Sequence, residues 1–101
     1  MNKDLQIAKK TVQTEINALK KLSSSFSHKS QFSKAVNLIS RNKGKCLVIG
    51  VGKSYLVGLK VSATLSSLGT PSVAFSAGND LGHGGLGFLS KDDILLVFSV
   101  S

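Results

Sequence analysis

The chain has 101 residues, of which 42% are hydrophobic and 18% are charged, and its formal net charge is +8. This length allows one domain of ordinary size, and the composition is that of a globular protein rather than of a disordered one. No apolar run approaches the roughly 20 residues that a membrane-spanning helix needs, and the N-terminus lacks the apolar segment of a secretory signal. We therefore expect a cytoplasmic protein that does not enter a membrane.

The positive charge is confined to the first part of the sequence. Residues 1–45 carry ten of the thirteen basic side chains and two of the five acidic ones, whereas residues 46–101 are neutral overall. These basic residues are spread out without interleaved aromatic side chains, unlike the clustered basic surfaces that bind nucleic acids. We expect a solvated helix surface here, and no nucleic acid as a partner.

Two amphipathic helices are predicted within residues 1–43. In the first, from about residue 3 to 22, apolar residues recur at steps of three or four. These residues are Leu5, Ala8, Val12, Ile16, Leu19 and Leu22. A serine-rich loop follows, Ser30 can cap a second helix, and Gly44 stands just beyond its basic last turn. The pair is expected to form a helical hairpin.

Beyond the hairpin, strands alternate with a helix. The continuous apolar run Cys46–Ile49 is typical of a strand buried on both faces, in which the cysteine is a small buried residue. A helix ended by Gly69 and Pro71, a strand over residues 72–75 and a third strand over Asp93–Phe98 follow. Such alternation predicts parallel strands with right-handed crossovers, and hence an α/β layered domain.

The last residues of the sequence fall at the expected position of a binding loop. In open parallel sheets, ligands bind beyond the carboxyl ends of the strands, so Ser99-Val100-Ser101 should begin such a loop. The sequence ends there, before the helix that such a loop normally enters. We therefore expect the chain to be truncated, with only the first part of its sheet domain present.

A glycine-lysine-serine turn joins the first strand to the helix that follows it. In Gly50-Val51-Gly52-Lys53-Ser54, the glycines allow a phosphate to approach the backbone, and the helix N-terminus offers unpaired N–H groups. Lys53 adds a positive charge and Ser54 adds a hydroxyl. This pattern predicts an anion-binding site.

Other interpretations of this turn are weaker. A P-loop that shares Gly52-Lys53-Ser54 would have its first glycine at Leu47, inside the strand. A dinucleotide-binding motif would have its third glycine at Tyr55, and no acidic residue ends the next strand. We therefore rank ATP hydrolysis and dinucleotide binding low. A plain strand–helix turn with incidental glycine and lysine residues is the simpler alternative.

Three motifs follow one another after residue 44. They are Gly50-Val51-Gly52-Lys53-Ser54, Thr64-Leu65-Ser66-Ser67-Leu68-Gly69-Thr70-Pro71 and His83-Gly84-Gly85-Leu86-Gly87. With the start of a Ser-x-Ser-Gly-Glu motif at Ser99, they resemble the sugar isomerase (SIS) domain, and within it the bacterial arabinose-5-phosphate isomerases. The resemblance implies a Rossmann-like, three-layer α/β fold, with a helical hairpin over residues 1–43 and the first half of the parallel-sheet domain over residues 44–101.

The resemblance also implies a reaction and a set of site residues. The expected function is aldose–ketose isomerisation of a sugar phosphate, with D-arabinose 5-phosphate and D-ribulose 5-phosphate as the expected pair. Lys53 and His83 are the implied catalytic residues. The implied phosphosugar-binding residues are Gly50, Gly52, Lys53, Ser54, Ser99 and Ser101. No metal or organic cofactor is expected, and the full-length protein is expected to form a homo-oligomer.

Several features depart from the family pattern. Gly85 stands where the family has aspartate, and Asp80 stands where it has glutamate. An isomerase also needs an acid/base group, and the family's candidates for this role, a later glutamate and a later histidine, are not in this sequence. Two alternatives therefore stay open: a SIS module that binds a phosphosugar without catalysis, as in regulators, and an inactive remnant.

Overall fold

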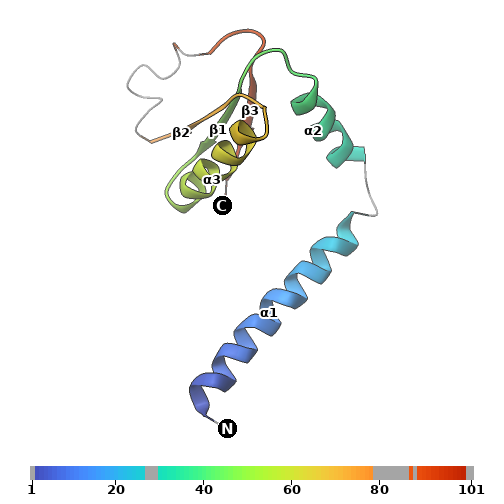
Figure 1. Ribbon diagram of the computed structural model, residues 1–101, viewed down its shortest axis with the longest axis vertical. Coiled ribbons are helices and arrows are strands. Elements are labelled where there is room, and N and C mark those ends of the chain that lie inside the picture. The colour runs from blue at the N-terminus through green and yellow to red at the C-terminus, as the bar shows by residue number, and fades with distance from the viewer. Residues whose placement is uncertain (1, 27–29, 79–86, 88, 100–101) are drawn as a thin grey trace. The chain divides into compact units, whose positions relative to one another are not determined.

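A helical segment followed by a small α/β unit makes up the structure, a computed structural model that describes residues 2–26, 30–78, 87 and 89–99. The elements are α1 (Lys3–Ser25), α2 (Ser30–Ser40), β1 (Cys46–Gly50), α3 (Lys53–Ser67), β2 (Ser72–Ser76) and β3 (Ile94–Val97) (Figure 1). The chain divides into two compact units, Met1–Lys34 and Ala35–Ser101. The predicted order of elements is confirmed, whereas the predicted boundary between residues 43 and 44 stays a prediction.

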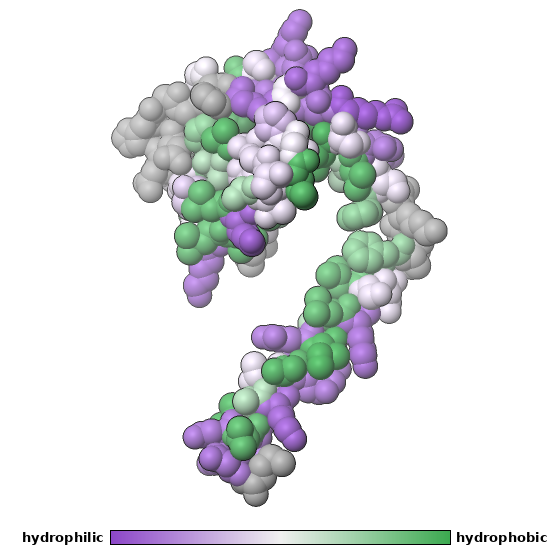
Figure 2. Space-filling model, viewed as in Figure 1, coloured by the Kyte–Doolittle hydropathy of each residue, from purple (hydrophilic) through white to green (hydrophobic). Residues whose placement is uncertain are grey.

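The first helix, α1, is amphipathic, as its sequence period predicts. Its first turn is capped by the side chain of Asn2, whose Oδ1 accepts a hydrogen bond from the N–H of Asp4 at 2.7 Å. The predicted apolar stripe lies along the helix and is exposed, with Leu19 64% accessible (Figure 2). Its packing in a hairpin stays a prediction. Among the described residues, no helix is both long and apolar enough to cross a membrane.

The three strands form one parallel sheet in the order β2–β1–β3. The central strand is β1, in which Cys46 pairs with Ser72 of β2 on one side and with Ile94 of β3 on the other. Cys46, Leu47 and Val48 are at most 1% exposed, which confirms the predicted strand that is buried on both faces. Burial also raises the pKa of the Cys46 thiol, as expected of a cysteine that acts as a small apolar residue.

One helix, α3, packs against β1 and β2 in the same unit (Figure 1). Gly58 makes the close approach possible, because a Cβ at this position would lie 3.0 Å from Cγ1 of Val48. The helix ends at Ser67, and Gly69 follows with a φ of 98°, a conformation that favours glycine. The predicted end of this helix is therefore confirmed.

The third strand, Ile94–Val97, is one residue shorter at each end than the predicted Asp93–Phe98. Asp93 instead closes a turn before the strand, in which its N–H donates to the carbonyl of Ser90 at 3.1 Å. Its carboxylate accepts hydrogen bonds from the N–H groups of Lys45 at 3.0 Å and Ser90 at 2.8 Å. It also forms an ion pair with Nζ of Lys45 at 2.7 Å. These contacts join the segment before β1 to the turn before β3, so that the two strands start side by side.

Candidate functional site

The candidate site lies at the carboxyl end of β1, where the chain turns into α3. Gly50 is the last residue of β1 and is buried. A Cβ at Gly50 would lie 2.7 Å from the carbonyl carbon of Ser54 and 2.8 Å from the backbone nitrogen of Tyr55. Since only a hydrogen atom fits between these groups, glycine allows the first turn of α3 to lie directly on the end of the strand.

Gly52, the second glycine of the motif, has a different reason to be glycine. It is the residue that precedes α3, with a φ of 59° and a ψ of −127°. Residues with a Cβ rarely adopt this backbone conformation. A Cβ at Gly52 would have no heavy atom within 4 Å, so the requirement comes from the backbone and not from a lack of space.

The first turn of α3 presents backbone N–H groups toward the end of the sheet. The N–H of Ser54 donates to the carbonyl of Val51 at 3.1 Å, and that of Leu56 donates to the carbonyl of Gly52 at 3.2 Å. Within the described part of the chain, the N–H groups of Lys53 and Tyr55 have no backbone acceptor. Together with the positive end of the helix dipole, such groups favour an anion. No acidic side chain lies in this turn to oppose one.

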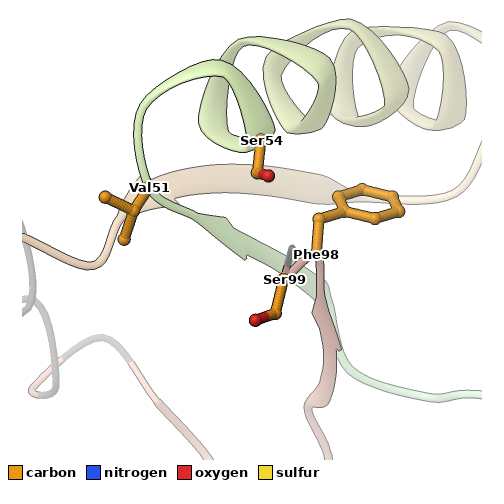
Figure 3. Close-up of a pocket in the computed structure, with 4 residues that line it drawn as sticks. All are labelled: Val51, Ser54, Phe98 and Ser99. Carbon is orange, nitrogen blue, oxygen red and sulfur yellow. The ribbon is translucent and has the colours of Figure 1, made fainter. Parts of the chain in front are cut away.

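A cavity of about 220 Å³ opens beside this turn (Figure 3). Its lining residues are Val51, Ser54, Phe98 and Ser99. The two serines provide hydroxyl groups that can donate or accept hydrogen bonds, and the other two side chains are apolar. A ligand with a polar group and a short carbon skeleton therefore fits the chemistry of this surface.

The structure brings together some of the predicted site residues. Ser54, from the first turn of α3, and Ser99, from the segment after β3, both line the cavity. Gly50 and Gly52 shape the turn beside it. Lys53 is the exposed first residue of α3 and is not among the lining residues.

Other predicted residues fall outside the part of the chain that the structure describes. His83 and Ser101 are among them, as are the two departures from the family pattern, Asp80 and Gly85. Their predicted roles stay predictions.

Two lining residues, Val51 and Phe98, were not predicted. Apolar side chains carry no chemical signal in a sequence, and both are of types expected in a core. Their positions were the available clue, because each stands just after the end of a strand, where an open parallel sheet binds its ligands.

A comparison with sequence models of protein families shows to which family the chain belongs. The family model of the SIS domain matches residues 38–101, which include the whole sheet, α3 and the cavity. The chain belongs to the SIS domain family. The predicted resemblance to the SIS domain is therefore confirmed, and the turn between β1 and α3 is part of a SIS domain.

Curated relatives of this SIS chain include arabinose 5-phosphate isomerases. KdsD of Pseudomonas aeruginosa is 46% identical over 70 residues, which are 69% of this chain and 21% of the relative. KdsD of Francisella tularensis is 36% identical over 104 residues, which cover 100% of this chain and 31% of the relative. The chain thus spans between a fifth and a third of the length of these relatives.

A solved structure is also similar to this SIS chain. It is that of an E. coli CFT073 protein in complex with arabinose 5-phosphate, with a TM-score of 0.85 and 33% sequence identity. The similarity covers 100% of this chain and 53% of that one. The α/β fold that the sequence motifs predict is therefore confirmed.

Proposed function

We propose that this SIS protein is a sugar-phosphate aldose–ketose isomerase that interconverts D-arabinose 5-phosphate and D-ribulose 5-phosphate. The observation that carries the proposal is the similarity, over the whole chain, to a protein in complex with arabinose 5-phosphate. The names of the curated relatives support the same substrate. The cavity supports it as well, because its hydroxyls lie beside a helix N-terminus that favours an anion.

In this proposal, the phosphate group binds at the start of α3. The backbone N–H groups of Lys53 and Tyr55, which have no backbone acceptor among the described residues, can donate to an anion. Ser54 and Ser99 add hydroxyls from two sides of the cavity. The side chain of Lys53 contributes positive charge at the same helix end. Ser101 would extend the phosphate-binding loop.

Isomerisation itself needs more than this phosphate site. A base removes the proton from C2 of the aldose while O1 takes up a proton, which gives the enediol. C1 is then protonated while O2 gives up its proton to become the carbonyl of the ketose, so an acid/base group must reach both carbons. Among the described residues, those that line the cavity contain neither a carboxylate nor an imidazole. We assign proton transfer to His83. This composition of the described lining favours a second candidate function, that of a SIS module that binds a phosphosugar without catalysis.

Two further properties belong to the proposal. The phosphorylated sugar is the expected small-molecule partner, and the full-length protein is expected to self-associate, as the family resemblance implies. The cytoplasmic location is likewise a prediction.

The reaction is tested by incubating the chain with D-arabinose 5-phosphate and following D-ribulose 5-phosphate by NMR. We expect conversion that falls by about 100-fold or more in His83→Ala, because general acid–base catalysis contributes this much. His28→Ala is the matched control, since it removes the chain's other histidine. Binding of the sugar phosphate without any conversion would contradict the isomerase proposal and establish the binding module instead.

A further inference from the structure

We propose that Phe98 is a positioning residue of the cavity: its ring, lodged beside Gly58 of α3, holds Ser99 in place opposite Ser54. The inference rests on the proposed function, because it assigns the two serine hydroxyls to one phosphorylated ligand.

The backbone of Phe98 is the last part of the chain that is tied to the sheet before Ser99. Its N–H donates to the carbonyl of Ile49 at 2.8 Å, which continues the β1–β3 pairing one residue beyond the end of β3. Among the described residues, the hydroxyl of Ser99 has no hydrogen-bond partner. The position of Ser99 therefore depends on the residue before it.

The ring of Phe98 occupies space that glycine leaves open on α3. A Cβ at Gly58 would lie 3.7 Å from Cδ2 of Phe98, which is ordinary van der Waals contact, and Figure 3 shows the ring next to the helix. A larger side chain at Gly58 would extend into the region that the ring fills. Gly58 and the ring thus form a fitted pair between α3 and the end of β3.

This fitted pair is on the same side of α3 as the candidate phosphate site. Ser54 and Gly58 are four residues apart in one helix, so they lie on one face, one turn from each other. A ring that is fixed against Gly58 is therefore next to Ser54, and Ser99 follows directly in the chain. The Phe98 ring, which also lines the cavity, consequently sets the spacing between the two hydroxyls.

The test uses the 101-residue chain with Phe98→Ala, Phe98→Leu and a matched control, Val97→Ala. Val97 is the neighbouring residue of β3, is 59% exposed and does not line the cavity. The first measurement needs no ligand: the amide ¹H–¹⁵N shifts of Ser54 and Ser99. We expect both to move in Phe98→Ala and to return toward wild type in Phe98→Leu. Because leucine lacks a ring current just as alanine does, this return reports packing. Identical shifts in the two variants would overturn the inference.

The second measurement is the affinity of each variant for D-arabinose 5-phosphate and for inorganic phosphate. We expect Phe98→Ala to bind both about tenfold more weakly, Phe98→Leu about threefold more weakly, and Val97→Ala as wild type does. Wild-type affinity in a folded Phe98→Ala would overturn the inference and leave the proposed function standing. If Phe98→Ala does not fold, Phe98→Leu decides, and an affinity equal to that of Val97→Ala overturns the inference. A wild-type chain that binds neither compound would contradict the proposed function, and the amide shifts would then decide the role of Phe98 alone.

Discussion

Replacing Gly50 by alanine is expected to lower the free energy of unfolding by about 3 kcal/mol, the upper part of the usual range for overpacking. The added Cβ would lie within 2.8 Å of the carbonyl carbon and oxygen of Ser54 and of the nitrogen of Tyr55. All three are backbone atoms, so no side chain can rotate away and the first turn of α3 must shift. For a domain of this size, the melting temperature should fall by about 15 °C.

The same substitution is expected to weaken phosphosugar binding by more than about tenfold, because the shifted turn carries the N–H groups and the hydroxyl that the proposal assigns to the phosphate. Gly78→Ala is the matched control, since a Cβ there would meet no heavy atom within 4 Å. Thermal unfolding and a binding titration of both variants check the prediction. A Gly50→Ala chain as stable as Gly78→Ala would contradict the close contact between β1 and α3.

Replacing Asp93 by asparagine is expected to lower the melting temperature at pH 7 and to flatten its dependence on pH. The pKa of Asp93 lies well below its usual range, chiefly because the side chain of Lys45 donates a hydrogen bond to the carboxylate. The backbone N–H groups of Lys45 and Ser90 also donate to this carboxylate and lower the pKa further. Burial acts in the opposite direction, but it is outweighed. The folded state therefore holds this carboxylate ionised more strongly than the unfolded chain does.

The sign of the pH effect follows from this lowered pKa. A carboxyl of this kind stabilises the fold above its unfolded pKa of about 3.9, and the stabilisation is lost as the pH falls toward the folded pKa. The wild-type melting temperature should therefore decline below about pH 5, more steeply than that of Asp93→Asn. Asp92→Asn, which removes the same charge from an exposed neighbour, is the matched control. Equal slopes for wild type and Asp93→Asn would show that the Lys45–Asp93 pair does not stabilise the fold.

Much of the fold could be predicted because its signals are local in the sequence. The run from Cys46 to Ile49 has the continuous apolar character of a central parallel strand, and β1 is buried on both sides. The end of α3 could be predicted from Gly69, because the positive φ that favours glycine there is a property of a single residue. The start of β3 was harder to predict, because the carboxylate of Asp93 accepts hydrogen bonds from Lys45, which lies 48 residues earlier in the chain.

The candidate site likewise contains some residues that could be predicted from the sequence and others that could not. The glycines, Lys53 and Ser54 could be predicted because they share one short motif whose chemistry suits an anion. Val51 and Phe98 could not, since an apolar residue shows its role only when the cavity beside it is known. The role of Gly58 has no sequence signal either. Glycine is usually a weak helix former, whereas here its missing side chain makes room for Val48 and Phe98.

The proposed phosphosugar site is tested most directly by the melting temperature of the 101-residue chain with D-arabinose 5-phosphate, with ATP–Mg²⁺ in parallel. A ligand at 100 times its dissociation constant stabilises the fold by about 2.7 kcal/mol, which is a readily measured shift. We predict a rise with the sugar phosphate that is lost in Lys53→Ala and absent with ATP–Mg²⁺. No rise with the sugar phosphate, or a rise with ATP–Mg²⁺ alone, would contradict a phosphosugar site at the start of α3.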